Sequence, residues 1–268
     1  MTKITTINAK ELYKSFLPFG DNHDLVKQCY FRGESSNKYK LLPSIFRDQI
    51  QKKWNIKSYD LQTDYGQIQL ERDILLEFYE NANRHGLAIP DVKDKLQKEL
   101  NYWPDKDIIP LIALAQHYGT PTRLLDWSYD YKVALYFAAI GACKKKKTQK
   151  DYMILWALKK NAFENSREED VLQKTVPVYA NNPNLHAQQG LFVYYQFHDQ
   201  TIDKSHSSQR LPLTKKFTKN IHKFKIPYHD RYELLKLLDD DGINAASIFP
   251  GYSGTSQAVY EKMFYLQD

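Results

Sequence analysis

The chain has 268 residues, of which 42% are hydrophobic, and its 38 basic and 32 acidic residues give a formal net charge of +6. This length fits one domain with a sizeable core, and the mild basic bias permits a phosphate-bearing partner but is too weak to indicate a dedicated nucleic-acid-binding domain. Two cysteines, Cys29 and Cys143, exclude a disulfide-built scaffold and a cysteine-rich zinc site. The N-terminus has no apolar signal segment, and no uncharged apolar run reaches the roughly 18 residues of a spanning helix. We therefore expect a cytoplasmic protein that has no membrane partner.

The first half of the chain carries mainly helical patterns. Apolar residues recur at helical spacing over 67–85, and Gly86 is a natural stop. Further helices are expected over 92–101, over 110–119, where a proline suits the first turn, and over 132–143.

Strand patterns dominate the second half. They occur at 152–158, 176–179, 191–197, 221–226 and 243–249. The continuous apolar run at 152–158 is typical of a strand buried on both faces. A helix is expected over 229–238, and the polar range 199–216 predicts a long mobile loop. The fold class is therefore α+β, with a helical N-terminal half packed on a mixed or antiparallel sheet.

The first polar motif is Arg32 between two aromatic residues and the pair Gly33-Glu34. This pattern predicts the end of a strand where the backbone comes close to another group. The planar fork of donors on arginine suits a phosphate or a carboxylate. The alternative is a structural ion pair between Arg32 and Glu34.

The densest polar cluster is QHYGTPTRLLDWS at 116–128, which joins one expected helix to the next. Such a junction can direct several side chains into one cleft. His117 could act as an acid, a base or a hydrogen-bond donor near neutral pH. Arg123 and Asp126 could form an ion pair, and Asp126 or Ser128 could instead cap the following helix.

A third motif places Gln188 and Gln189 before Gly190 and an apolar strand. Glutamine amides can recognise another amide or the edge of a base, whereas the alternative is a plain turn into the strand. The phosphate-binding loop, HExxH, CxxC and G-x-S-x-G motifs are absent, and the scattered histidines have no ligand spacing. We predict no metal site.

These motifs together resemble the FRG-domain family. The matching stretches are YFRGE at 30–34, LLPSIFR at 41–47, QHYGTPTRLLDWS at 116–128, VALYFAA at 133–139, AQQGLF at 187–192 and INAASIFPGYSG at 243–254. The resemblance spans roughly residues 20–260, which implies that residues 1–268 form a single FRG domain.

A second resemblance, to the arginine-type ADP-ribosyltransferases, points to a mechanism. That family carries an aromatic-Arg-Gly on its first core strand and a Ser-Thr-Ser-like motif before a helix with V-A-x-x-F-A. It also has a Gln or Glu two residues before a catalytic Glu. The similar stretches here are 30–33, 126–128 with 133–138, and 188–190. Asp126 stands where the first serine would be, and Gly190 stands where the catalytic Glu would be.

This resemblance implies an ADP-ribosyltransferase-like fold and NAD as a co-substrate. Arg32 would bind the phosphates, and Glu34 or Asp126 would stabilise the oxocarbenium-like transition state, or Gln189 would play a weakened part in doing so. His117 and Tyr118 would orient the ribose or accept a proton. The catalytic candidates are Arg32, Glu34, His117 and Asp126, and the candidates for cofactor binding are Arg32, Tyr118, Arg123, Gln188 and Gln189.

Three functions remain open at this point. The first is an NAD-using, ADP-ribosyltransferase-like enzyme, such as a bacterial toxin or phage-defence effector. Its acceptor would be a nucleic acid or a protein, and an antitoxin or regulator protein could restrain it. The second is a nuclease or other nucleic-acid-acting enzyme, suggested by the positive charge and by His117, Arg123 and Glu34. The third is a non-catalytic module that uses the polar cluster to bind a ligand or a nucleic acid.

Overall fold

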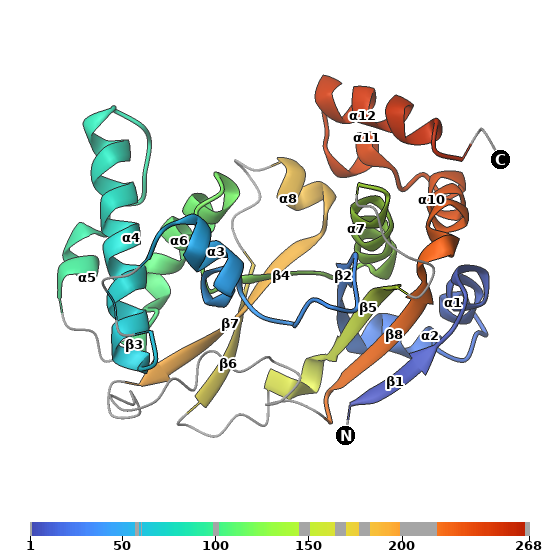
Figure 1. The fold of residues 1–268 in the computed structure, drawn as a ribbon, viewed down its shortest axis with the longest axis horizontal. Helices are drawn as coiled ribbons and strands as arrows, with labels where there is room; N and C mark the ends of the chain where they lie inside the picture. Colours follow the sequence, from blue (N-terminus) through green and yellow to red (C-terminus); the bar gives the residue numbers. More distant parts are fainter. Residues whose placement is uncertain are drawn as a thin grey trace.

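The computed structural model describes residues 2–56, 59, 61–98, 102–144, 151–163, 170–176, 183–198 and 219–265. Its strands are β1 (Lys3–Thr6), β2 (Cys29–Glu34), β3 (Tyr102–Trp103), β4 (Leu125–Ser128), β5 (Tyr152–Lys159), β6 (Asp170–Thr175), β7 (Gly190–His198) and β8 (Ile221–Pro227). They form a sheet in the order β1-β8-β5-β2-β4-β7-β3, with β6 added to β7 (Figure 1). The β1–β8 pair is parallel and the other pairs are antiparallel, so the sheet is mixed.

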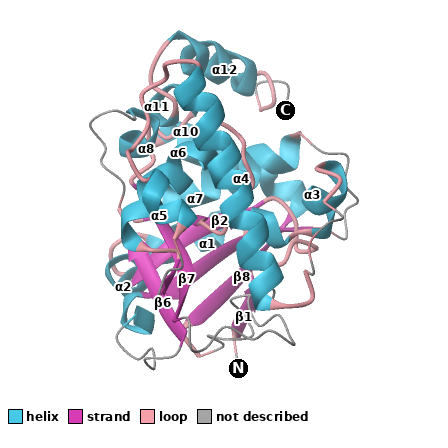
Figure 2. Ribbon diagram, turned by 90° about the vertical axis from the view of Figure 1, so that its left-hand side faces the viewer, coloured by secondary structure: helices cyan, strands magenta, loops and turns pink. Residues whose placement is uncertain are grey.

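Most of the helices lie on one side of this sheet (Figure 2). The α-helices are α1 (Ala9–Phe16), α2 (His23–Gln28), α3 (Asp48–Lys53), α4 (Asp64–Arg84), α5 (Lys93–Gln97), α6 (Ile109–His117), α7 (Tyr131–Cys143), α8 (Pro183–Ala187), α10 (Arg231–Asp240), α11 (Ala245–Ile248) and α12 (Tyr252–Lys262). Short 3₁₀ turns cover η1 (Ser44–Phe46), η2 (Lys106–Ile108), η3 (Lys160–Phe163) and η6 (Tyr228–Asp230).

The α+β class is confirmed, as are the main elements expected from periodicity. The structure contains the predicted helices as α4, α6, α7 and α10, and the predicted strands at 152–158, 191–197 and 221–226 as β5, β7 and β8. The helix expected over 92–101 is shorter and ends at Gln97. The central strands β2 and β4 lie in the first half of the chain, so helices and strands are less segregated along the sequence than predicted.

The prediction of a strand over 243–249 is wrong, because this segment contains the short helix α11. The side chain of Asn244 accepts hydrogen bonds from the backbone of Ala246 and Ser247, and the Ser247 hydroxyl accepts one from the backbone of Asn244. This reciprocal capping box starts a helix despite the strand-like composition. The predicted loop 199–216 and most of the predicted strand 176–179 lie outside the described residues.

Both faces of the sheet are buried in apolar clusters. On β5, Met153, Leu155 and Ala157 face α7 and α10, whereas Ile154 and Trp156 join a separate cluster on the opposite face. This two-sided burial explains why the strand is apolar throughout rather than alternating. A third cluster packs α4 and α6 against β7.

The sheet has a gap between its two central strands, β2 and β4. The six residues Cys29–Glu34 pair with β5, and the four residues Leu125–Ser128 pair with β7. By contrast, β2 and β4 pair only through Phe31 and Ser128. Because these two strands are antiparallel, the end of β2 at Arg32–Glu34 and the start of β4 at Leu125–Asp126 are not joined to each other. Side chains from both strands can therefore meet in the gap.

Helix α7 crosses β2 directly above Gly33. A Cβ atom on Gly33 would lie 1.8 Å from the carbonyl oxygen of Ala134 and 2.9 Å from the backbone nitrogen of Ala138. Only a residue without a side chain allows this close approach. The glycine of the Phe-Arg-Gly motif is therefore required by helix packing.

A Gly33→Ala variant should lose more than about 3 kcal/mol of unfolding free energy, which is beyond the usual cost of overpacking, because backbone atoms have to move. Urea denaturation measures this change. The control is Gly86→Ala at the end of α4, where φ is 67° and no atom lies within 4 Å of an added Cβ. There only the left-handed backbone conformation opposes alanine, at about 1–2 kcal/mol. A loss at Gly33 no larger than at Gly86 would contradict the packing account.

Candidate active site at the opening of the sheet

Arg32 lies in the gap between β2 and β4 and is held from both sides. Its Nε donates to Oε1 of Glu34 at 3.0 Å, and its Nη2 lies 2.9 Å from the same oxygen. Its Nη1 donates to the carbonyl oxygen of Asp126 at 2.6 Å and lies 3.5 Å from Oδ2 of the Asp126 side chain. Burial lowers the pKa of Arg32, but Glu34 and Asp126 together raise it above its ordinary value, so the guanidinium stays charged. The Arg32–Glu34 ion pair considered from the sequence is confirmed.

The carboxylate of Asp126 is oriented by a second chain of contacts from α6. The side-chain amide of Gln116 donates to Oδ1 of Asp126 at 2.7 Å, and its carbonyl accepts a hydrogen bond from the hydroxyl of Thr122. Thr122 is held in turn by Ser44, whose hydroxyl donates to the carbonyl oxygen of Thr122 and accepts a hydrogen bond from its backbone nitrogen. Gln116 and Arg32 thus orient the two carboxylate oxygens of Asp126, and 66% of the Asp126 side chain remains exposed.

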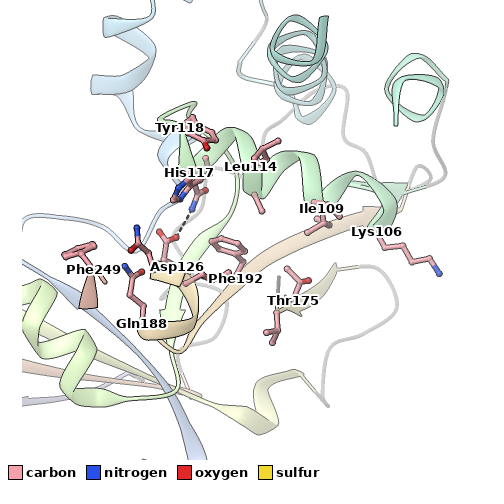
Figure 3. Close-up of a pocket in the computed structure, with 16 residues that line it drawn as sticks. Lys106, Ile109, Leu114, His117, Tyr118, Asp126, Thr175, Gln188, Phe192 and Phe249 are labelled. Atoms are coloured by element: carbon pink, nitrogen blue, oxygen red, sulfur yellow. Dashed lines mark hydrogen bonds between the residues drawn. The ribbon is translucent and has the colours of Figure 1, made fainter. Parts of the chain in front are cut away.

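Two adjacent cavities share Asp126 in their lining. The inner chamber, of about 360 Å³, is lined by Arg32, Gly33, Ser128, Val133, Phe137 and Gly190, among others. The outer chamber, of about 630 Å³, runs along α6 (Figure 3). Both chambers share Asp126, Leu185, Gln188, Phe192 and Phe249. Asp126 is therefore the carboxylate that a ligand in either chamber would meet.

The structure brings most of the predicted residues to this cleft. His117 and Tyr118 line the outer chamber, with their rings edge to face at 5.0 Å, and Tyr118 is 73% exposed. Gln188 lines both chambers, whereas the side chain of Gln189 lines neither. Gln189 acts through its backbone, which accepts a hydrogen bond from Tyr129 and has a φ of 46°. Glu34 is buried beside Arg32 and lines neither chamber.

The expected pairing of Arg123 with Asp126 is wrong. Arg123 is 2% exposed and pairs with Glu71 of α4, with Nε at 2.5 Å and Nη2 at 2.9 Å from its two oxygens. Its Nη1 donates to the carbonyl oxygen of Tyr195, and its guanidinium lies 5.8 Å from the ring of Trp103. Arg123 lines neither chamber, and its charge is satisfied within the core. Arg123 is therefore a structural residue.

Neither Asp126 nor Ser128 caps the following helix. Asp126 is part of β4, and the helix begins after Asp130, whose side chain accepts a hydrogen bond from the backbone of Lys132. The Ser128 hydroxyl donates to the carbonyl of Gln188 and accepts from the backbone of Asp130. Ser128 therefore ties the end of β4 to the segment before β7, which keeps Gln188 at the cleft.

Two residues near the site were missed by the sequence reasoning. Gln116 was part of the polar cluster but received no role, although it orients Asp126. Arg47 ends the LLPSIFR stretch, and its Nε donates to the carbonyl of Leu42 at 2.9 Å. Burial lowers the pKa of Arg47, the negative field of Glu34 opposes this, and Arg32 lowers it further. Arg47 thus adds positive charge near the Arg32–Glu34 pair. Its place in the LLPSIFR stretch, which carries the family resemblance, was the available signal.

Among the described residues, no group of three or more His, Cys, Asp or Glu side chains is arranged to hold a metal ion. Within the same ranges, the helices are too short or too polar to cross a membrane. Burial raises the pKa of both Cys29 and Cys143 to about 11, so neither thiol is activated as a nucleophile.

The comparisons with known proteins identify the motif-bearing part of the chain. No curated protein and no solved structure matches the sequence. Residues 27–150 match the family model described as the FRG domain. This range contains β2, α6, β4 and α7, and therefore Arg32, Gln116, His117 and Asp126. As the YFRGE and QHYGTPTRLLDWS motifs predict, this part of the chain matches the FRG domain.

Proposed function

We propose that the chain is an NAD-using enzyme of the ADP-ribosyltransferase type. It would break the bond between nicotinamide and the ribose C1′ atom and transfer the ADP-ribosyl group to an acceptor. The observation that carries this proposal is the meeting of three separate stretches at one cleft. Arg32 on β2, Asp126 on β4 and Gln188 before β7 lie up to 156 positions apart in the sequence and line the same inner chamber.

The inner chamber has the chemistry that a nicotinamide ring requires. The side chains of Phe137 and Phe249 offer apolar walls for a flat ring, and the amide of Gln188 can pair with a carboxamide. Arg32 keeps its charge, and its five N–H donors exceed what Glu34 and Asp126 use, so a donor is left for a phosphate oxygen.

Asp126 is the better placed of the two candidate carboxylates. When the glycosidic bond breaks, its electron pair goes to nicotinamide and positive charge develops on the ribose. A carboxylate in the cleft stabilises that charge, and Asp126 lines both chambers with its oxygens already oriented. Glu34 instead contacts Arg32 and lines neither chamber. We therefore assign the electrostatic role to Asp126 and a positioning role to Glu34.

Calorimetric titration with NAD tests the binding half of the proposal. Wild-type protein should bind NAD, and Arg32→Ala should lose most of this affinity because the phosphate donor is gone. Arg84→Ala is the matched control, since Arg84 is an exposed residue at the end of α4 away from both chambers. Unchanged NAD affinity in a folded Arg32→Ala protein would count against the proposal.

The biological setting follows from this activity as part of the same proposal. An enzyme that consumes NAD or modifies cellular targets would harm the cell that makes it. A cytoplasmic toxin or antiviral defence effector, restrained by a partner protein, fits such an activity. If NAD does not bind, the alternatives are a nucleic-acid-acting enzyme and a non-catalytic module, and RNA is the next ligand to titrate.

A further inference from the structure

The outer chamber is larger than the nicotinamide ring needs and extends away from Arg32. Its wall is α6, from His117 beside Asp126 to Ile109 at the other end (Figure 3). This stretch of helix is roughly 12 Å long. Phe192 and Thr175 lie across from it, and Lys106 lies at the end farthest from Asp126 (Figure 3). The chamber therefore has a carboxylate at one end and a cation at the other.

The cation at the far end is available to a ligand. Lys106 is exposed, and no carboxylate of the described residues pairs with it. Its acidic neighbours are engaged elsewhere, because Asp107 pairs with Lys95 at 3.1 Å and the side chain of Asp105 caps η2. A phosphate is the natural partner of such an exposed lysine.

The middle of the chamber suits a flat, polar-edged ring. Ile109, Leu114 and Phe192 provide apolar walls, and the amide-bearing residues Asn184 and Gln188 are part of the lining. Amide side chains pair with the edges of bases, and bases gain stability by stacking on apolar and aromatic surfaces. Tyr118, largely exposed at the rim, offers a further stacking surface.

We propose that the outer chamber is the acceptor subsite and that it takes a nucleobase of a single-stranded nucleic acid, with the adjoining phosphate on Lys106. This assignment rests on the proposed function, because it names the acceptor of that reaction. A base paired in a duplex could not reach the chamber without leaving its stack, so single strands are favoured. The net charge of +6 supports approach of a polyanion.

The chemical step is an exchange of one bond at C1′ of the NAD ribose. An N–H group of the base attacks C1′, a new C–N bond forms, and the bond to nicotinamide breaks with its electron pair going to nicotinamide. The proton released by the attacking nitrogen passes to the imidazole of His117, which lines the outer chamber near Asp126 (Figure 3). Imidazole side chains can accept a proton near neutral pH.

Fluorescence anisotropy with labelled single-stranded DNA and RNA oligonucleotides tests the assignment on the full chain. We expect at least one of them to bind, with affinity falling as salt rises. Lys106→Gln should lower the slope of that salt dependence by about one, the change expected for one lost phosphate contact. Ala113→Phe, which fills the wall of the chamber, should abolish oligonucleotide binding and leave NAD affinity unchanged.

The control is Lys10→Gln on α1, which removes the same charge at an exposed position outside the chamber and should change nothing. Absence of oligonucleotide binding, or equal binding by Ala113→Phe, would overturn the assignment. So would ADP-ribose found on protein but not on the oligonucleotide. If NAD still binds in those cases, the proposed function stands and only the acceptor is wrong. Oligonucleotide binding without NAD binding would instead retain a nucleic-acid site and remove the transfer reaction.

Discussion

An Asp126→Asn variant should fold like the wild type and release nicotinamide from NAD at least about a hundredfold more slowly. The size of this effect is that of removing one preorganised charge from a transition state, about 10²–10³ in rate. The substitution keeps the shape of the side chain and an oxygen for Gln116, but it removes the negative charge at the junction of the two chambers. Chromatographic measurement of nicotinamide over time gives the rate.

Glu34→Gln is the matched control for this effect. It also removes one carboxylate charge beside Arg32, but from a buried side chain that lines neither chamber. We expect a smaller loss of rate, caused by weaker positioning of Arg32. A large loss in Glu34→Gln together with a nearly normal rate in Asp126→Asn would show that the roles of the two carboxylates are reversed.

Arg123→Met should destabilise the fold by about 3–5 kcal/mol, the usual cost of removing one partner from a buried ion pair. Glu71 is 5% exposed and would lose the guanidinium that now contacts both of its oxygens. The backbone carbonyl of Tyr195 would also lose a donor. Urea denaturation monitored by circular dichroism measures the loss.

The double variant Arg123→Met/Glu71→Met should recover part of this stability, because no uncompensated charge remains. Recovery should be incomplete, since the indole of Trp103 also donates to Glu71 at 3.1 Å. At temperatures where the single variant is folded, its NAD affinity should equal that of the wild type. Lost NAD affinity in Arg123→Met without lost stability would show that Arg123 belongs to the binding site after all.

The sequence predicted the long helices and the main strands because their apolar periodicity is set by burial. Helix α4 and strand β5 are such cases, since each buries apolar residues against the rest of the fold. The segment 243–249 failed because the polar capping residues Asn244 and Ser247 determine its conformation more strongly than its apolar neighbours. The strand β4 was missed because it is only four residues long, which is too short to show a clear apolar alternation.

The candidate site was predictable in composition but not in arrangement. The Arg32–Glu34 pair could be expected because both residues lie on one face of a strand, two positions apart. The partner of Arg123 could not, because Glu71 lies 52 residues away on another helix. Arginines that bind ligands and arginines that neutralise buried carboxylates look alike in a sequence, so only the fold separates Arg32 from Arg123.

The gap in the sheet also could not be read from the sequence. It depends on β2 and β4 pairing through one residue pair, while each pairs fully with its outer neighbour. That pairing is what brings Arg32 to the backbone of Asp126 at 2.6 Å and places both residues on the inner chamber.

The most direct test of the account is the release of free nicotinamide when the purified chain is mixed with NAD, alone, with single-stranded oligonucleotides and with cell protein. The account predicts nicotinamide in at least one of these mixtures and its near absence when Asp126→Asn replaces the wild type. Intact NAD in every mixture, from protein that is folded and concentrated enough to be saturated, would contradict the proposed transferase activity.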